Sequence, residues 1–189
     1  MSEGNAHIID FSVNGLEAGI KNSELKIEKE KEINIVAKVA ALLPELQDEN
    51  GAMIAQRPLD RQPYWNIERS RIGNGRKVRV ELIVNGNAVD TTEIIADGAW
   101  KNINFQYAIK QSSWIALRIF PSAHTNPVFV LVNHKPISVQ KSAEWCRDAL
   151  NQCWKMKQTG IRAEERSAAE AIYDNARKVY EGIIKNSVQ

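Results

Sequence analysis

Hydrophobic and polar residues alternate with a period of two over much of residues 1–137, which is typical of half-buried β-strands. Within residues 114–120 two sets of side chains are predicted to face opposite ways: Ile115, Leu117 and Ile119 on one side, and Trp114, Ala116, Arg118 and Phe120 on the other. A guanidinium is expensive to bury alone, so we expect Arg118 either on a wet face or held by a carboxylate or loop carbonyls. Residues 128–132 are continuously apolar, which predicts a strand covered on both faces.

Further strands are predicted by alternation at residues 8–13, 33–39, 78–84 and 103–109. In the first of these, Ile9, Phe11 and Val13 are expected on one face. Asn14-Gly15 and Asn85-Gly86 follow two of the strands, and both residue types tolerate the positive φ of a tight turn. Roughly eight short strands with no long helix between them predict a mainly β protein, an immunoglobulin-like antiparallel β-sandwich over residues 1–137.

Residues 44–77 break the alternation and predict a long irregular insertion in the sandwich. Three prolines and dense charge fill this segment, with a short helix expected near residues 52–56. Loops of this length inside a compact domain are often functional. The insertion concentrates aromatic and arginine side chains, which binding surfaces favour. The candidate contact residues here are Tyr64, Trp65, Arg69 and Arg71.

After residue 137 the hydrophobic period becomes helical, which predicts a C-terminal α-helical hairpin over residues 138–189, packed on the sandwich. Ser142 is the expected cap of the first helix. Residues 161–184 are expected to form the second. Its buried face is predicted to carry Ala168, Ile172, Ala176, Val179 and Ile183. We expect Trp145 and Trp154 in the core of the helix–sheet junction.

The two cysteines, Cys146 and Cys153, lie seven residues apart within the first predicted helix. That spacing separates them by about 10 Å along a helix, whereas a disulfide needs Cα atoms within about 7 Å. We therefore expect two buried free thiols.

The charge and composition of the chain limit the classes of binding partner that we expect. The net charge is +2 and 43% of the residues are hydrophobic, so a core is expected but no strong attraction to polyanions. A basic cluster at residues 69–79 is bordered by the acidic residues Glu68 and Glu81, and we predict no nucleic-acid partner. The chain contains no apolar run of about 18 residues, so no membrane span is expected. Residues 1–10 do not have the pattern of a signal peptide.

Catalytic and metal-binding patterns are weak. None of His7, His124 and His134 has metal-ligand spacing to another histidine or to a cysteine, so no metal or other cofactor is expected in this segment. Ser122 and His124 lack the setting of a nucleophile elbow, and residues 72–77 lack phosphate-loop spacing. The proline-flanked loop instead offers binding or domain-contact candidates: Arg118, Ser122, His124, Thr125 and Asn126.

Five segments resemble, in combination, the C-terminal region of bacterial PHP-type metallohydrolases of the carbaryl-hydrolase (CehA/McbA-like) branch. They are DFSVNG (10–15), RPLDRQPYWNIERSRIG (57–73), VELIVNG (80–86), SSWIALRIFPSAHTNPVFVLV (112–132) and SAEWCRDALNQCW (142–154). In that family the metal-binding catalytic domain lies upstream, and its ligand motifs do not occur in this sequence. The resemblance therefore implies an accessory module of a metal-dependent hydrolase, not an enzyme in its own right. Members are often exported, which implies a periplasmic or extracellular origin.

Three hypotheses follow. The first is a non-catalytic accessory module that docks on the upstream catalytic domain of the same natural polypeptide and supports it. The second is a carbohydrate-binding β-sandwich, which requires exposed, coplanar aromatic rings and would make a glycan the partner. Its candidate residues are Tyr64, Trp65, Trp100 and Trp114. The third is a hydrolase with its own site near His124.

Overall fold

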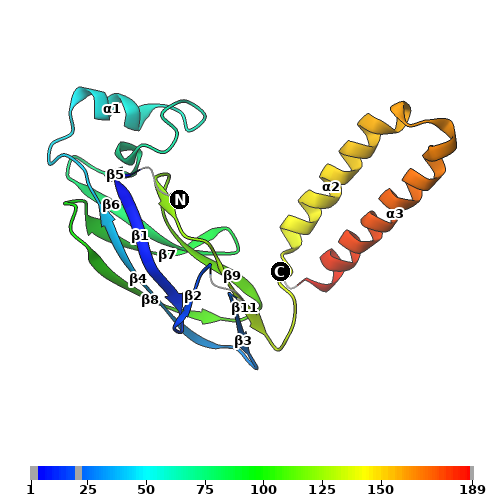
Figure 1. Ribbon diagram of the computed structural model, residues 1–189, viewed down its shortest axis with the longest axis horizontal. Coiled ribbons are helices and arrows are strands. Elements are labelled where there is room, and N and C mark those ends of the chain that lie inside the picture. The colour runs from blue at the N-terminus through cyan, green and yellow to red at the C-terminus, as the bar shows by residue number, and fades with distance from the viewer. Residues whose placement is uncertain (1–3, 20–22, 188–189) are drawn as a thin grey trace. The chain divides into compact units, whose positions relative to one another are not determined.

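The computed structural model describes residues 4–19 and 23–187, and the chain divides into two compact units, Met1–Lys135 and Pro136–Gln189. The expectation about a signal peptide falls partly on residues 1–3, outside the described residues. Figure 1 shows that the first unit is built mainly of β-strands, with one short helix, and the second of two long helices. The strands are β1 (Ala6–Val13), β2 (Leu16–Glu17), β3 (Glu24–Ile27), β4 (Lys31–Ala41), β5 (Arg71–Ile72), β6 (Lys77–Val84), β7 (Asn87–Ile95), β8 (Lys101–Ile109), β9 (Ser113–Ile119), β10 (Ala123–His124) and β11 (Val128–Val132).

The strands form two sheets. The smaller sheet has the order β2-β1-β4-β8, and the larger one runs β3-β11-β9-β6-β5, with β10 paired to β9 and β7 paired to β6. Strand β11 pairs with β3 in parallel, and the other pairs between described strands are antiparallel. The predicted two-sheet, mainly β architecture with a C-terminal helical hairpin is confirmed.

One hydrophobic core joins the two sheets. Ile33 and Ile35 of β4 contribute to it from the smaller sheet, and Leu82 of β6, Ile115 and Leu117 of β9 from the larger one. All five side chains are at most 1% exposed. Sheets with one apolar face each must bury those faces together, which is why the alternation along the chain produces two layers. The strand predicted at residues 78–84 and the facing predicted for residues 114–120 are confirmed.

Two strand predictions are wrong. Strand β1 has a register shift between Ile9 and Ser12, and Asp10 at that bulge has a φ of 53°. The extra residue turns Ile9 outward, away from the face shared by Phe11 and Val13, and Ile9 is exposed. Strand β11 is covered on one face only, because Phe129 points outward and is exposed.

Both predicted Asn-Gly turns form, with positive φ at all four residues. Each asparagine also bonds to a neighbouring strand. Asn34 N donates to Asn14 Oδ1 at 2.8 Å. Trp114 N donates to Asn85 Oδ1 at 3.0 Å, and Asn85 Nδ2 donates to Ser113 Oγ at 3.0 Å. The turns therefore help to fix the register of their sheets.

The insertion at residues 44–77 contains a helix, a 3-10 turn and a short strand. Helix α1 (Glu49–Gln56) begins at Asp48, whose carboxylate accepts from Gly51 N at 2.6 Å. It includes the predicted helical residues 52–56. The 3-10 turn η1 (Ile67–Ser70) follows Asn66 and leads into β5. Ile67 is buried in the sandwich core, so the insertion is anchored on the sheets.

The second unit is an antiparallel hairpin of α2 (Gln140–Lys157) and α3 (Ala163–Asn186), joined by the 3-10 turn η2 (Gln158–Gly160). The rings of Trp154 and Tyr173 lie 4.8 Å apart between the helices. The thiol Sγ of Cys153 is 3.3 Å from the Tyr173 hydroxyl oxygen, a hydrogen bond that raises the pKa of Tyr173. Both cysteines are free and half-buried.

One hairpin prediction, the cap at Ser142, is wrong. Helix α2 begins before Ser142, at Gln140, and its cap residue Val139 makes no side-chain hydrogen bond. The face of α3 predicted to be buried is not covered by the hairpin, since Ile172 and Val179 are exposed. Trp145 of α2 is also exposed. No helix among the described residues is long and apolar enough to cross a membrane.

Candidate functional site

A groove of about 630 Å³ lies on the outer face of the larger sheet. Strand β9 turns Ile115, Leu117 and Ile119 inward, so its alternate residues face outward into the groove. In register, Phe129 of β11 lies opposite Trp114, and His124 of β10 lies opposite Arg118. The groove is lined by Trp65, Ile83, Gly86, Trp114, Ala116, Leu117, Arg118, Phe120, Pro121, Ala123, His124, Thr125, Asn126, Pro127 and Phe129.

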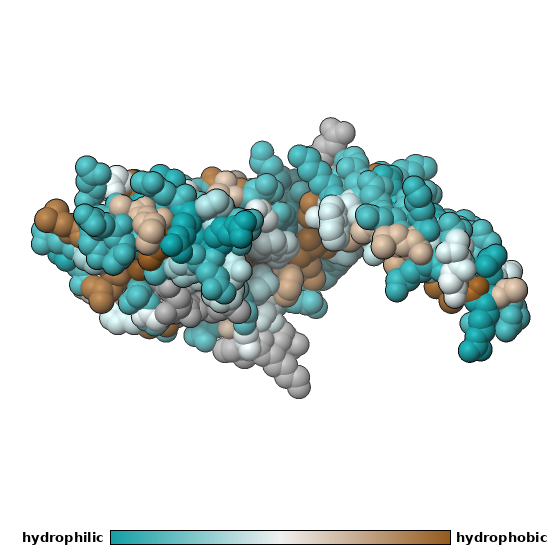
Figure 2. Space-filling model, turned by 90° about the horizontal axis from the view of Figure 1, so that it is seen from above, coloured by the Kyte–Doolittle hydropathy of each residue, from teal (hydrophilic) through white to brown (hydrophobic). Residues whose placement is uncertain are grey.

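The groove has an apolar floor and aromatic walls. Ile83 and Ala116, which are register partners on β6 and β9, are buried beneath it. Trp65, Phe120 and Phe129 are exposed around it. The face drawn in Figure 2 is mainly hydrophilic, with hydrophobic side chains gathered in separate patches. Concave surfaces with apolar walls and a few polar groups are typical of binding sites.

Arg118 is the main charged group in the groove. Its Nε forms an ion pair with Glu81 Oε2 from the adjacent strand, and its guanidinium carbon lies 5.0 Å from the centre of the Phe120 ring. The prediction that a carboxylate could hold this arginine is confirmed. Neither terminal guanidinium nitrogen hydrogen-bonds another described residue, and the side chain is 34% exposed. Arg118 is therefore held in place from one side and can receive an acceptor from the other.

The loop at residues 120–127 forms the polar rim. Thr125 N donates to Leu117 O at 2.9 Å, and Leu117 N donates to Thr125 Oγ1 at 3.1 Å, so Thr125 extends the pairing of β9. His124 is exposed, and its Nδ1 lies 3.2 Å from Thr125 O. A second hollow of about 300 Å³ borders the same rim, lined in part by His124, Asn126 and Asp10. The rim can therefore offer polar atoms to a ligand or partner on two sides.

Ser122 contributes to the loop's interior. It is buried, and its hydroxyl lies 3.2 Å from Ser70 Oγ in η1. Ser70 Oγ also donates to Phe120 O at 2.8 Å. These contacts join the insertion to the rim loop. Ser122, a predicted contact residue, therefore holds the loop in place and is too buried to face a partner.

Arg69 and Arg71, predicted as contact residues, hydrogen-bond to backbone carbonyls of the insertion. The Arg69 guanidinium donates to four backbone carbonyls, those of Arg57, Pro58, Arg61 and Pro63, at 2.7–3.1 Å. The Arg71 side chain is 1% exposed and donates to the carbonyls of Pro44 and Gly75, both at 3.0 Å. Loops turn carbonyl oxygens inward, and each buried carbonyl needs a donor. The predicted contact role is therefore wrong for Arg71, whose side chain is buried, whereas Arg69 is half-buried with its donors occupied inside the insertion.

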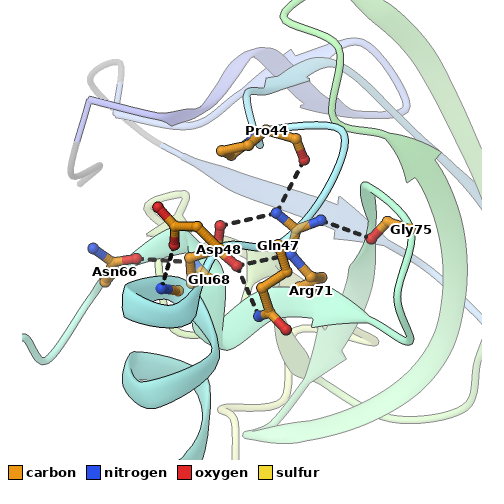
Figure 3. Close-up of polar contacts among 8 residues, drawn as sticks. Pro44, Gln47, Asp48, Asn66, Glu68, Arg71 and Gly75 are labelled. Atoms are coloured by element: carbon orange, nitrogen blue, oxygen red, sulfur yellow. Dashed lines mark hydrogen bonds and ion pairs between the residues drawn. The ribbon is translucent and has the colours of Figure 1, made fainter.

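Figure 3 shows the polar cluster around Arg71, in which Glu68 is the counter-ion. Arg71 Nε donates to Glu68 Oε2 at 2.7 Å, and a terminal nitrogen donates to Glu68 Oε1 at 2.9 Å. These hydrogen bonds lower the pKa of Glu68 and raise that of Arg71. Gln47 donates to the same carboxylate at 3.0 Å. The cluster holds the start of the insertion against its end.

The fold brings Trp65 together with Arg118, His124, Thr125 and Asn126, although the insertion is distant in sequence. Tyr64 is exposed beside Trp65, with ring centres 6.2 Å apart and planes at 59°, but it does not line the groove. Sequence reasoning missed three further site residues, Glu81, Phe120 and Phe129. The outward position of Phe120 was visible in the alternation of residues 114–120.

Among the described residues, no group of three or more His, Cys, Asp or Glu side chains is arranged to hold a metal ion. What the groove offers chemically is an apolar surface, one oriented guanidinium and a polar rim. No protein-family model matches this chain, and the comparison with curated proteins finds no match either.

Proposed function

We propose that this chain is a non-catalytic accessory module that docks, through the groove beside β9, on the catalytic domain of a PHP-type metal-dependent hydrolase. The observation that carries the proposal is the convergence of Trp65, Phe120 and Phe129 around Arg118. Exposed aromatic and arginine side chains in one concave patch are what the centre of a protein interface contains. The resemblance of residues 57–73 and 112–132 to the accessory region of that family supplies the kind of partner.

The fixed position of Arg118 between aromatic side chains supports docking. The ion pair with Glu81 and the Phe120 ring restrict the motion of Arg118 before any partner arrives. Preorganised side chains lose less conformational entropy on binding, so each contact contributes more to affinity. The aromatic walls would take an apolar side chain of the partner, and Arg118 would take a carbonyl or carboxylate.

The test is to combine this chain with the hydrolase domain that the natural polypeptide places upstream, and to measure binding, hydrolase activity and melting temperature. Trp65→Ala and Arg118→Ala should each weaken docking at least tenfold, as expected for interface hot spots. Trp100→Ala and Arg79→Ala are matched controls, because Trp100 is exposed and neither residue lines the groove. Docking that is equally strong in all four variants would refute the proposal.

Carbohydrate binding is the second candidate, favoured by the presence of both Trp65 and Trp114 in one groove. The 59° angle between the Tyr64 and Trp65 rings does not give the coplanar platform expected for these two residues. Titration of the chain with a series of soluble oligosaccharides, followed by tryptophan fluorescence, separates the candidates. Saturable binding that Trp114→Ala abolishes would favour the glycan.

A further inference from the structure

The C-terminal hairpin leaves large apolar side chains uncovered on both helices. Ala143 is the one described residue of α2 and α3 that is buried. The exposed fractions of the large side chains are 72% for Trp145 and Met156, 70% for Ile172, 54% for Val179 and 36% for Ile183. Two helices packed only on each other bury one stripe each, and here a second apolar stripe remains outside.

The uncovered residues have the spacing of a helix-packing seam. In α2 the seam consists of Trp145, Ala149, Gln152 and Met156, and in α3 of Ile172, Ala176, Val179 and Ile183. Both sets are spaced four, three and four residues apart. This is the spacing with which the side chains of one helix fit between those of another.

Both seams lie on the same side of the hairpin. The helices meet through rows that contain Cys153 in α2 and Tyr173 in α3. In each helix the seam residues come one position before the residues of the meeting row. The seam is therefore rotated by about 100° around the helix axis from the meeting row. Because the helices are antiparallel, this rotation turns the two seams toward the same side.

The opposite side is polar. Asn151 of α2 and Asp174 of α3 lie there, and Arg177 from the meeting row of α3 joins them: its Nε donates to Asn151 Oδ1 at 2.8 Å, and its guanidinium pairs with Asp174. The hairpin is therefore amphipathic as a unit, with one face made of two parallel apolar rows. We call the eight seam residues the hairpin face.

We infer that the hairpin face packs on the hairpin face of a second copy of this chain, forming a symmetric four-helix bundle. A seam with this spacing fits other helices, and bundles bury such rows in their centre. A second copy supplies two helices with seams of the same length.

The available area suits a dimer. At roughly 150–250 Å² for a fully exposed large side chain, the five exposed residues offer on the order of 600 Å² per copy. Two copies then bury about 1,200 Å², the lower end of the range for specific interfaces. Ala149 and Ala176 in the middle of the seams let helices approach closely. Gln152 is the polar seam position, and such a residue can fix the register and number of helices.

The test uses the full chain in analytical ultracentrifugation. At about 100 µM we expect a species of twice the 21.3 kDa chain mass. Ile172→Lys should raise the dissociation constant of the dimer at least tenfold, because it places a charge in the α3 seam of each copy. Ser167→Lys is the matched control, since this exposed residue of α3 lies about 140° around the helix from Ile172, away from the hairpin face. Circular dichroism of each variant reports whether the hairpin stays helical.

Trp145→Lys on α2 provides an independent variant in case Ile172→Lys unfolds the hairpin. A wild-type chain that stays monomeric at this concentration overturns the inference. So does a dimer that both seam variants leave intact while their helicity is retained. Hydroxyl-radical labelling that finds Trp145 and Met156 protected in a monomer would show that the face is covered within one chain, which also overturns it.

Discussion

At the scale of single residues, an arginine in this chain contributes according to which acceptors the fold places around it. Arg69 and Arg71 have their donors occupied by carbonyls and by Glu68, whereas Arg118 is held through Nε alone. The sequence shows where positive charge lies but not which oxygens surround it. For that reason the sequence could indicate that Arg118 lies on a wet face or is held by a carboxylate or loop carbonyls, while the identity of Glu81, far away in the chain, could not be predicted.

The Glu68–Arg71 pair makes stability depend on pH. The pKa of Glu68 lies below its usual value of 4.5 in the folded protein because Arg71 donates to the carboxylate. The pair's contribution is therefore complete above pH 4.5 and is lost as the pH falls through the lower, folded-state pKa. Glu68→Gln leaves the buried guanidinium of Arg71 without a counter-ion, so we expect a loss of about 3 kcal/mol at neutral pH.

Urea unfolding of wild type and Glu68→Gln at about pH 7 and at steps down to about pH 3 measures this. The two stabilities should converge as the pH falls. Glu93→Gln is the control, because its ion pair with Lys77 is exposed and should contribute less than about 1 kcal/mol. A constant gap between wild type and Glu68→Gln at all pH values would contradict the assignment.

At the scale of elements, local sequence signals worked where neighbours along the chain decide the outcome. Alternation predicted β6 and β9, and the Asn-Gly pairs predicted their turns. Local signals failed where a contact across the fold decides. The bulge at Asp10 reverses the facing of Ile9, and two helices alone cannot bury the α3 stripe that sequence periodicity marks as apolar.

The Asn85 turn offers a test of how an element is tied to its neighbour. Asn85→Gly keeps the positive φ but removes the two side-chain hydrogen bonds to β9, so we expect a loss of about 1–2 kcal/mol. Asn133→Gly is the matched control, because Asn133 also has a positive φ and its side chain makes no hydrogen bond to another described residue. Chemical denaturation of both variants gives the difference, and equal stabilities would show that the side-chain bonds contribute nothing.

For the whole molecule, the sequence predicted the candidate site in part. The rim residues His124, Thr125 and Asn126 lie in one proline-flanked loop, so their proximity needed no knowledge of the fold. Trp65 was singled out by composition alone. Trp65 lines the same groove as Arg118 because η1 is anchored by the hydrogen bond of Ser70 and by the burial of Ile67. These two contacts join segments that are distant in sequence. Such long-range contacts leave no periodic trace in a single sequence.

The distribution of the core predicts that the sandwich folds without the hairpin. The connected hydrophobic core runs from Ala6 to Val132 and draws on both sheets. Removing residues 136–189 takes no member from this core, so we expect the melting temperature of the sandwich to change by less than about 5 °C. The shortened chain should also be monomeric, since the hairpin face is gone. Circular dichroism and ultracentrifugation check both points, and a shortened chain without a cooperative β-sheet transition would mean that the sandwich depends on the helices for its stability.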